Sequence, residues 1–249
     1  MRKVCVCGKG GSGKSVVSAL LAKVLAEEGY TVLAVDSDES NPGLYLMFGF
    51  DSAPMPLVDV RRGGAYIMRE FEQERLSLED IPSEYLVEDG GLKLLTVGKI
   101  TEALQGCACT MGAIVKDLLG KLVLKDNEFV VVDTEAGVEH FGRGLEKNID
   151  TVLVVVEPSF ESIALAERVK DLAGAIGENQ VWAVLNKITS DGMEETVREK
   201  LGKRYIKAIG TVHYDPLVSE VCFEGKALGD SQAKEDVRRI VRLLLAKPE

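Results

Sequence analysis

The chain has 249 residues, is 46% hydrophobic and 28% charged, and carries a net charge of −10, a balance typical of a globular protein with a substantial core. The acidic excess argues against nucleic acid and against membranes as partners, because both are bound through surplus Lys and Arg. An odd number of cysteines, no charged-then-apolar leader and no long apolar run lead us to expect a cytoplasmic protein with reduced thiols and no membrane span.

Short apolar runs rich in β-branched residues alternate with segments whose apolar residues recur at helical spacing. Several runs are apolar at nearly every position, as in parallel strands buried on both faces. The predicted strands are 3–7, 31–35, 92–97, 129–133, 151–156, 181–185 and 205–210, and the predicted helices are 15–28, 62–75, 111–124, 160–175, 192–201 and 232–246. This alternation predicts one α/β domain over residues 1–249, with a doubly wound, mostly parallel sheet flanked by helices. Ligands of such sheets bind where the strands end.

The first strand is followed by "GKGGSGKS", residues 8–15, which fits the phosphate-loop pattern G-x-x-x-x-G-K-[ST] between a strand and a helix. Glycines let backbone N–H groups wrap a phosphate, and the helix N-terminus adds partial positive charge. We expect Lys14 to reach the β- and γ-phosphates and the Ser15 hydroxyl to ligate Mg²⁺. The predicted nucleotide-binding loop comprises Gly8, Lys9, Gly10, Gly11, Ser12, Gly13, Lys14, Ser15 and Val16. The alternative is a glycine-rich turn without a ligand.

A second lysine, Lys9, makes the loop match the deviant form K-G-G-x-G-K-[ST]. On this motif the chain resembles the ATPases that include nitrogenase iron protein, the septum-positioning and chromosome-partitioning ATPases and the arsenite-pump ATPase. The resemblance implies that Lys9 reaches across a two-fold dimer to the phosphates of the partner's nucleotide. A cation delivered in this way stabilises developing phosphoryl charge, as an arginine finger does. Otherwise Lys9 is a solvated loop charge.

The second strand ends in "DSDESNPG", which places Asp36 and Asp38 two positions apart at the predicted ligand edge. The resemblance implies that this is switch I, with Asp38 positioning the attacking water and Asp36 near the loop lysine and Mg²⁺. Orienting a water is sufficient work for a carboxylate here, because phosphoryl transfer demands little covalent chemistry from the protein. The alternative is an acidic cap on the next helix.

Two cysteines, Cys107 and Cys109, lie in "GCACTMG" before the predicted helix 111–124. One intervening residue can direct two sulfurs at one ion, although structural zinc sites usually space them by two to four residues. A two-fold partner would supply two more and complete a tetrahedral set. Thr110 is the expected N-cap of that helix, whose N-terminus favours the Cys109 thiolate. Apolar packing and thiol redox chemistry are the alternatives.

Three further cysteines are expected to be packing residues rather than ligands. Cys5 and Cys7 alternate along the first strand, where both faces of the sheet are covered, and a thiol there packs as a small apolar group. Cys222, in "LVSEVCFEG", is also expected in the core.

The strand 129–133 runs into "DTEAGVEH" and ends at Asp133, four residues before Gly137. By resemblance this is the Walker B aspartate leading into switch II. Asp133 then holds Mg²⁺ through water, and the Gly137 N–H senses the γ-phosphate. His140 is expected to be a surface or packing residue rather than a proton relay.

The strand 181–185 ends in "NKI". Asn186 matches the family's adenine-contacting asparagine, and we place Lys187 beside it in the nucleotide site. The loop after the next strand reads "VHYDP", where His213 stands at a position that is usually proline in the family.

With these motifs assembled, the chain resembles in particular the carbon monoxide dehydrogenase accessory ATPases, which are nickel-insertion factors with a Cys-x-Cys before a helix. "VVDTEAGVEHFGRG" and "VVVEPSFESI" also match that subgroup. The resemblance implies Mg-dependent hydrolysis of ATP to ADP and phosphate, and a homodimer formed with nucleotide or metal. It also implies Ni²⁺ or Zn²⁺ held by Cys107 and Cys109, for delivery to a client apo-enzyme such as carbon monoxide dehydrogenase.

A second hypothesis is a spatial-positioning ATPase of the septum or partitioning type. The predicted last helix, 232–246, has an apolar stripe opposite Arg238, Arg239 and Arg242, as a membrane-surface helix does. We favour the other interpretation, in which the stripe packs on the sheet. An electron-transfer protein like nitrogenase iron protein needs a second cysteine near switch II, and "DTEAGVEHFGRG" contains none.

Overall fold

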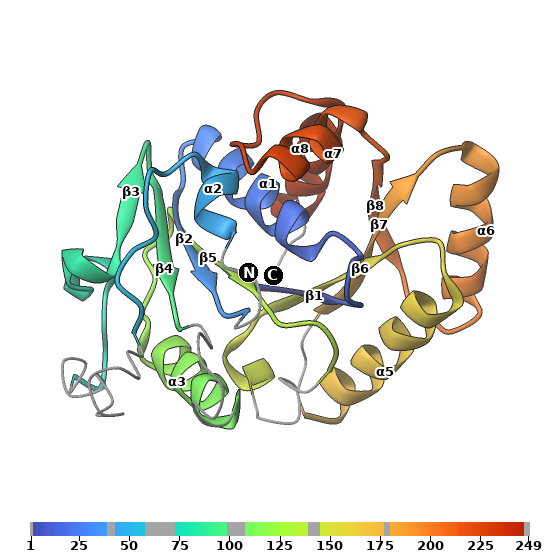
Figure 1. The fold of residues 1–249 in the computed structure, drawn as a ribbon. Coiled ribbons are helices and arrows are strands. Elements are labelled where there is room, and N and C mark those ends of the chain that lie inside the picture. Colours follow the sequence, from blue (N-terminus) through green and yellow to red (C-terminus); the bar gives the residue numbers. More distant parts are fainter. Residues whose placement is uncertain are drawn as a thin grey trace.

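A computed structural model describes residues 2–38, 43–57, 73–98, 108–138, 145–176 and 180–246, with backbone alone at 108–111, 145–146 and 175–176. Its eight strands form one sheet in the order β3-β4-β2-β5-β1-β6-β7-β8 (Figure 1). Neighbouring strands are parallel except β3 and β4, which are antiparallel. The strands are β1 (Lys3–Gly8), β2 (Thr31–Asp36), β3 (Val87–Asp89), β4 (Leu92–Thr96), β5 (Glu128–Asp133), β6 (Thr151–Val156), β7 (Gln180–Ile188) and β8 (Ala208–His213). The predicted α/β fold with a mostly parallel sheet is confirmed.

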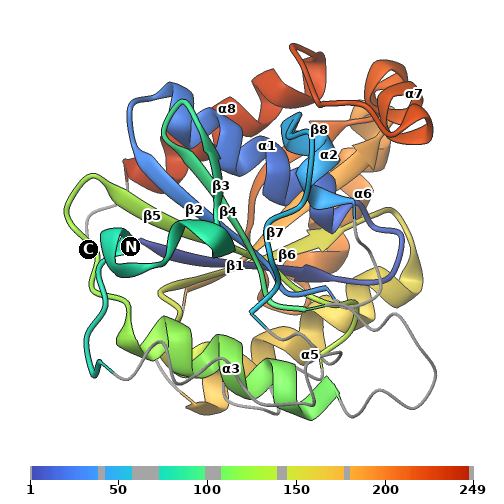
Figure 2. The same ribbon diagram turned by 60° about the vertical axis from the view of Figure 1, so that its left-hand side comes forward.

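Helices cover both faces of this sheet, with α1 and α8 on one side and α3 and α5 on the other (Figure 2). The helices are α1 (Lys14–Glu27), α2 (Leu44–Phe48), α3 (Ala108–Lys121), α5 (Phe160–Ile176), α6 (Asp191–Gly202), α7 (Pro216–Glu224) and α8 (Gln232–Leu245), with short 3₁₀ turns at Leu78–Asp80, Ser83–Tyr85 and Leu145–Asn148. Successive side chains of a strand point to opposite faces, so Val152 and Val154 join one core cluster while Leu153 and Val155 join the other. This double burial explains the continuous apolar runs.

Two elements lie a few residues away from the predicted ranges. β8 begins at Ala208 rather than at 205, because the chain after α6 first makes a tight turn in which Tyr205 has a φ of 57°. The N–H of Ile206 still donates to the Leu201 carbonyl there. α3 begins at Ala108, so Thr110 lies inside its first turn and the predicted N-cap role of Thr110 is wrong.

Three elements were not predicted, namely β3, α2 and α7. β3 has three residues and α2 has five, too few to show a period. α7 has no fully buried residue, and its Val218 and Val221 pack only partly against the core, although Asp215 as N-cap and Pro216 at the first turn are a start signal. The predicted helix 62–75 lies mostly outside the described residues, and its described end, 73–75, is not helical.

The predicted burial of the cysteines is confirmed for Cys5 and Cys7 but not for Cys222. Cys5 and Cys7 are buried in β1, which confirms their packing role. Cys222 is exposed, so its predicted place in the core is wrong. It lies on α7, which rests on the outside of the molecule and buries none of its side chains.

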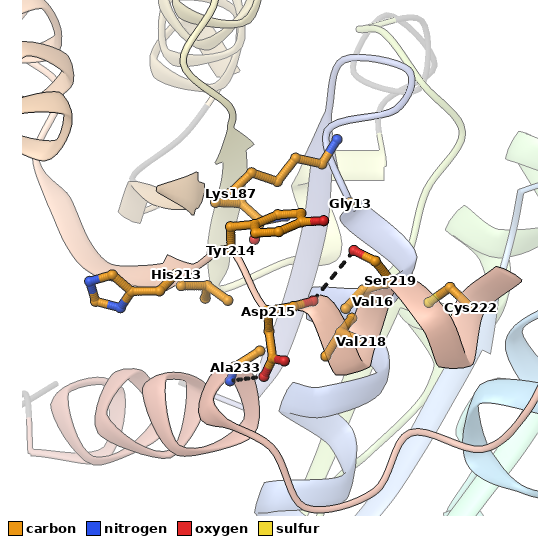
Figure 3. A pocket seen from close by; sticks show the side chains of 12 residues that line it. Gly13, Val16, Lys187, His213, Tyr214, Asp215, Val218, Ser219, Cys222 and Ala233 are labelled. Carbon is orange, nitrogen blue, oxygen red and sulfur yellow. Dashed lines mark hydrogen bonds between the residues drawn. The ribbon is translucent and has the colours of Figure 1, made fainter. Parts of the chain in front are cut away.

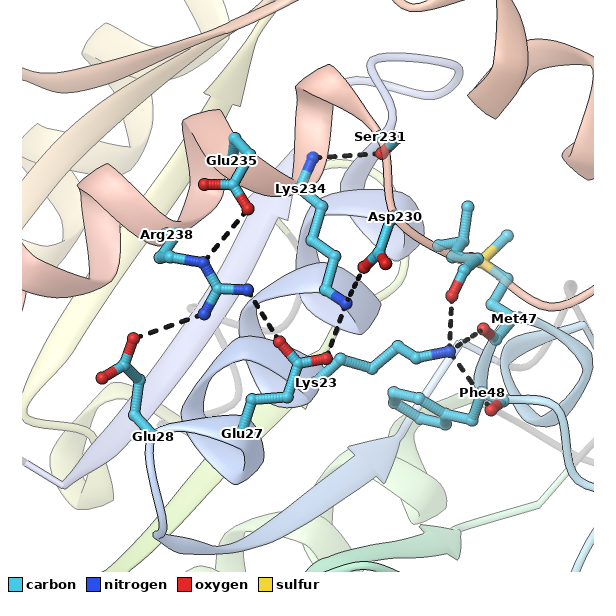
Figure 4. A network of polar contacts seen from close by, with 11 residues as sticks. Lys23, Glu27, Glu28, Met47, Phe48, Asp230, Ser231, Lys234, Glu235 and Arg238 are labelled. Carbon is cyan, nitrogen blue, oxygen red and sulfur yellow. Dashed lines mark hydrogen bonds and ion pairs between the residues drawn. The ribbon is translucent and has the colours of Figure 1, made fainter.

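The last helix packs on the sheet, as we favoured. Val237, Ile240, Val241 and Leu244 are all buried in the core beside α1 and β8. Its polar side is held to α1 by ion pairs between Lys234 and Glu27 at 2.6 Å and between Arg238 and Glu27 at 2.8 Å (Figure 4). The apolar stripe of α8 is therefore buried in the core. None of the described helices has both the length and the apolar composition needed to cross a bilayer.

The contact between β8 and α8 is so close that it requires a glycine. A Cβ at Gly210 would lie 2.4 Å from Cγ1 of Ile240. We expect Gly210→Ala to lower the free energy of unfolding by about 1–3 kcal/mol through overpacking, measured by chemical denaturation. Gly174→Ala is the matched control, because nothing lies within 4 Å of its added Cβ on α5. Equal effects of the two substitutions would contradict this account.

Candidate functional site

The glycine-rich loop lies between β1 and α1 at the carboxyl edge of the sheet. Gly8, Gly11 and Gly13 have positive φ values of 150°, 78° and 92°. Two of these glycines are also required by contact, since a Cβ at Gly8 would lie 2.6 Å from the Val155 carbonyl oxygen and one at Gly13 would lie 2.3 Å from Nδ2 of Asn186. The loop therefore presents backbone rather than side chains to whatever it encloses.

The side chains of the loop are arranged to receive negative charge. Lys14 is buried, and its Nζ donates to the Lys9 carbonyl at 3.4 Å. The Ser12 hydroxyl is fully buried and has no hydrogen-bond partner among the described residues. A buried hydroxyl without a partner costs about 1–3 kcal/mol, so an anionic oxygen placed there would remove a penalty. These features fit a bound phosphate.

Two carboxylates face the loop from neighbouring strands. Asp36 and Asp133 end β2 and β5, are paired in register, and are both buried. Asp133 accepts hydrogen bonds from Ser15 and, at 2.9 Å, from Ser18. Burial raises the pKa of Asp133 to about 7, and repulsion by Asp36 adds to this, against the hydrogen bond from Ser15. Oxygen ligands beside a phosphate site are the set that Mg²⁺ prefers, so the residues fit a magnesium ion.

Asp38 follows on the same edge and is also buried. Its N–H donates to Oδ1 of Asp36 at 3.3 Å, so the two predicted switch carboxylates are joined by a backbone hydrogen bond. Residues 39–42, which follow, lie outside the described residues. The structure thus places Asp36, Asp38 and Asp133 together, as the sequence predicted.

The predicted phosphate sensor, Gly137, has a φ of 106° and donates its N–H to the Gly8 carbonyl at 3.2 Å. The segment after β5 is thereby tied directly to the start of the phosphate loop. A γ-phosphate that engages this N–H must take it from Gly8. His140 lies outside the described residues.

On the other side of the loop, β7 supplies Asn186 and Lys187. Nδ2 of Asn186 donates to the Ser12 carbonyl at 2.7 Å, and the residue is buried. Lys187 has a φ of 59°, which is rare for a residue with a side chain, and its Nζ donates to the Gly11 carbonyl. Both predicted residues therefore touch the phosphate loop.

A largely apolar pocket of about 190 Å³ opens beside Asn186 (Figure 3). It is lined by Gly13, Val16, Asn186, Lys187, Val212, His213, Tyr214, Asp215, Val218, Ser219, Cys222 and Ala233. Nδ1 of His213 lies 2.8 Å from Asp236 on α8, so the residue that replaces the family's proline anchors this loop to α8. α7 forms one wall of the pocket and was not predicted from the sequence. The only sequence signal for this helix was its start at "YDP", with Asp215 as N-cap and Pro216 as the first helical residue.

The cysteine pair can be placed only in part. Cys107 lies outside the described residues, and only the backbone of Cys109 is described, in the first turn of α3. Nζ of Lys3, at the start of β1, donates to the Leu119 and Leu122 carbonyls at the other end of α3, at 2.6 and 2.8 Å. The N-terminal end of α3 therefore points toward the opposite edge of the sheet, where the phosphate loop lies.

Lys9 is half-buried and forms an ion pair with Glu157, at 3.1 Å from its Oε1. Glu157 and Ser18 are contacts of the site that the sequence motifs did not single out. Ser18 lies three residues after Ser15 on α1, on the same helix face, which is a usable signal. Glu157 follows β6 directly and carried no signal beyond its place at a strand end.

A parallel sheet with a glycine loop between its first strand and first helix, and carboxylates on the flanking strands, defines a P-loop nucleotide-binding protein. Comparison of sequences agrees, since residues 4–228 match the family described as the CobQ/CobB/MinD/ParA nucleotide binding domain. The chain belongs to this family and is a P-loop ATPase, with ATP or ADP and Mg²⁺ as its ligands.

Similar proteins include ATPases with different roles. An uncharacterised ATP-binding protein of Methanocaldococcus jannaschii is 38% identical over 83% of this chain and 86% of its own. The carbon monoxide dehydrogenase accessory protein CooC of Rhodospirillum rubrum is 34% identical over 76% of this chain and 75% of its own. Among solved structures, the septum site-determining protein MinD of Pyrococcus horikoshii, complexed with Mg-ADP, has a TM-score of 0.72 and 19% identity, covering 98% of this chain and 95% of that one.

The clash at Gly13 gives a test of the site. We expect Gly13→Ala to lower affinity for Mg-ATP at least tenfold, measured by calorimetry, because the added Cβ strikes Asn186 and shifts the loop. Gly29→Ala is the matched control, since its φ is 93° and nothing lies within 4 Å of its Cβ. Both variants carry backbone strain of about 1–3 kcal/mol, so only the first should lose nucleotide. Similar affinities of the two variants would contradict the role of the contact.

Proposed function

We propose that the protein is an ATP-hydrolysing metallochaperone acting in the cytoplasm. Its homodimer, formed with nucleotide or metal, holds Ni²⁺ or Zn²⁺ through Cys107 and Cys109 of each subunit and delivers it to an apo-enzyme such as carbon monoxide dehydrogenase. The observation that carries the proposal is the 34% identity to a carbon monoxide dehydrogenase accessory protein in a chain that also has a Cys-x-Cys. Neither nucleic acid nor a membrane is part of this scheme.

The phosphate chemistry follows from the contacts of the loop. Lys14 and the backbone N–H groups bind the β- and γ-phosphates, and Ser12 supplies a buried hydroxyl for one of their oxygens. Mg²⁺, when bound, neutralises charge that develops on the phosphates. Ser15 is positioned to ligate this ion, with Asp133 holding it through water. Asp38 orients the attacking water.

The pocket beside Asn186 suits an adenine base. Its walls are mostly apolar, as a stacked purine requires. Asp215 has both carboxylate oxygens engaged, since Oδ1 accepts from the Leu217 N–H at 2.9 Å and Oδ2 from the Ala233 N–H at 3.1 Å. These two hydrogen bonds tie the loop after β8 to α7 and α8 and so fix the wall of the pocket.

Coupling between nucleotide and metal has support in the placement of α3. The helix begins near the edge of the sheet that carries the phosphate loop, and Cys109 is in its first turn. A thiolate there gains from the helix N-terminus. Two copies meeting at this edge would bring four sulfurs and two nucleotides to one interface. Hydrolysis would then open the dimer and release the metal.

The metal role is tested by equilibrium dialysis with NiCl₂ or ZnCl₂ in the absence of nucleotide. The wild-type protein is expected to bind about one ion per two subunits, as a shared tetrahedral site requires. Cys107→Ala combined with Cys109→Ala should bind none at the same concentration. Cys222→Ala is the control, because this exposed thiol lies on α7 and belongs to no such pair. Unchanged stoichiometry in the double variant would refute the metal site.

The two lysines are tested by separating nucleotide binding from turnover. Lys14→Ala should lose both, because this side chain contacts the phosphates of its own subunit. Lys9→Ala should bind Mg-ATP normally but lower kcat by about 10³-fold or more, the scale of a cation supplied in trans. Lys203→Ala, an exposed lysine just after α6, should behave as wild type. Full activity of Lys9→Ala would contradict the action of Lys9 across a dimer.

A spatial-positioning ATPase is the second candidate, since a MinD of Thermotoga maritima is 28% identical over 74% of this chain. The membrane-surface helix that would support it is not offered by α8, whose apolar residues are buried. ATP-dependent co-sedimentation with anionic liposomes or DNA would favour this candidate over the metallochaperone.

A further inference from the structure

The ammonium group of Lys9 is held within its own subunit by Glu157, which directly follows β6. Glu157 accepts from Nζ of Lys9 at 3.1 Å through one oxygen and from Nζ of Lys187 at 3.2 Å through the other. The Glu157 side chain is 18% exposed, and those of Lys9 and Lys187 are 37% and 44% exposed. One carboxylate therefore bridges Lys9, which lies in the phosphate loop, and Lys187, which lies on β7 and contacts that loop.

The bridge is anchored at each end. The backbone N–H of Glu157 donates to the Ser162 hydroxyl at 3.2 Å, so the residue is fixed to the start of α5. Lys187 is held in a left-handed backbone conformation and also donates to the Gly11 carbonyl of the loop. Neither anchor involves the Lys9 side chain, which contacts Glu157 through its ammonium group.

The charges show that this contact competes with phosphate. Burial raises the pKa of Glu157, but the hydrogen bonds from Lys9 and Lys187 outweigh it and leave the pKa below its usual value, so the group is ionised at neutral pH. An ammonium group bound to this carboxylate is partly neutralised. It must leave the carboxylate before it can neutralise the phosphates of a second copy.

We propose that Glu157 is a positioning residue that retains Lys9 within its own subunit, so that the Lys9–Glu157 pair opens when two copies associate on ATP. This inference rests on the proposed action of Lys9 in trans, and does not depend on the metal. Removing the charge at position 157 frees Lys9 and favours association, whereas a purely structural role of Glu157 would not produce such a gain.

The test is sedimentation of the full-length protein with Mg²⁺ and a non-hydrolysable ATP analogue over a range of protein concentrations. Glu157→Gln is expected to shift the midpoint of association to about two- to fivefold lower concentration, the range for a partly exposed ion pair. The shift should shrink in 0.5 M salt, because exposed charges are screened. Glu161→Gln, an exposed glutamate in the first turn of α5, is the matched control and should leave the midpoint unchanged.

A double-variant cycle shows whether Glu157 acts through Lys9. In a Lys9→Ala background, Glu157→Gln should no longer shift the midpoint. Glu157→Asp keeps the charge on a shorter side chain and should give a smaller shift, which also provides a folded variant should Glu157→Gln lose stability. The proposal would be overturned if the midpoint for Glu157→Gln equals that of the wild-type protein or lies at higher concentration. It would also be overturned if Glu157→Gln shifts the midpoint equally in the Lys9→Ala background, or if neither the wild-type protein nor Glu157→Gln associates.

The outcomes for Glu157 and for the metal are separable. ATP-driven association that is enhanced by Glu157→Gln, in a protein that binds neither Ni²⁺ nor Zn²⁺, would support the role of Glu157 and refute the metallochaperone. Metal binding through the cysteines, with the same midpoint for Glu157→Gln as for the wild-type protein, would support the metallochaperone and refute the role of Glu157.

Discussion

The contact between Asn186 and the phosphate loop is the constraint on which the rest of the site depends. The Asn186 amide donates to the Ser12 carbonyl at 2.7 Å and fills the space that a Cβ at Gly13 would occupy. This single contact joins β7, which bounds the apolar pocket, to the loop that encloses the phosphates. The apolar pocket and the phosphate loop are thereby held at a fixed separation, which is how a rigid scaffold positions two ends of one ligand.

Around that contact the fold buries several polar side chains close together. Asp36 and Asp133 are buried side by side, at the cost reflected in the raised pKa of Asp133. Ser12 has a buried hydroxyl without a partner in the described part of the chain. A nucleotide with its cation adds positive charge beside the two carboxylates and an acceptor for the Ser12 hydroxyl. Ligand binding is thus favoured by the removal of penalties as well as by new contacts.

The backbone of Cys109, in the first turn of α3, and the phosphate loop are far apart in the chain but lie toward one edge of the sheet. This follows from the direction of α3, whose far end is held by Lys3 at the start of β1. A helix of 14 residues is about 21 Å long, so its two ends reach opposite edges of the sheet. The proposed nucleotide-driven dimer requires Cys109 and the nucleotide to lie on one edge, and this direction of α3 is compatible with it.

The fold was predictable because its strands are buried on both faces and its helices have one apolar side. Seven of the strands could therefore be predicted from apolar runs in the sequence, among them β5 with "FVVVD". Of the elements that were not predicted, β3 and α2 are too short to show a period, and α7 packs only Val218 and Val221 partly against the core. Cys222 was misplaced for the same reason, since an apolar residue on such a helix is not evidence of a core.

The sequence by itself determined the phosphate loop, its two lysines and the carboxylates at the strand ends, because each is a local pattern whose spacing carries its chemistry. The metal role of the cysteine pair stays a prediction. Only the tertiary structure decided which distant groups meet. Lys9 meets Glu157 across 148 positions, and Asn186 meets Ser12 across 174. Such contacts depend on the order of strands in the sheet, which places β6 beside β1 and β7 beside β6, and no local pattern encodes that order.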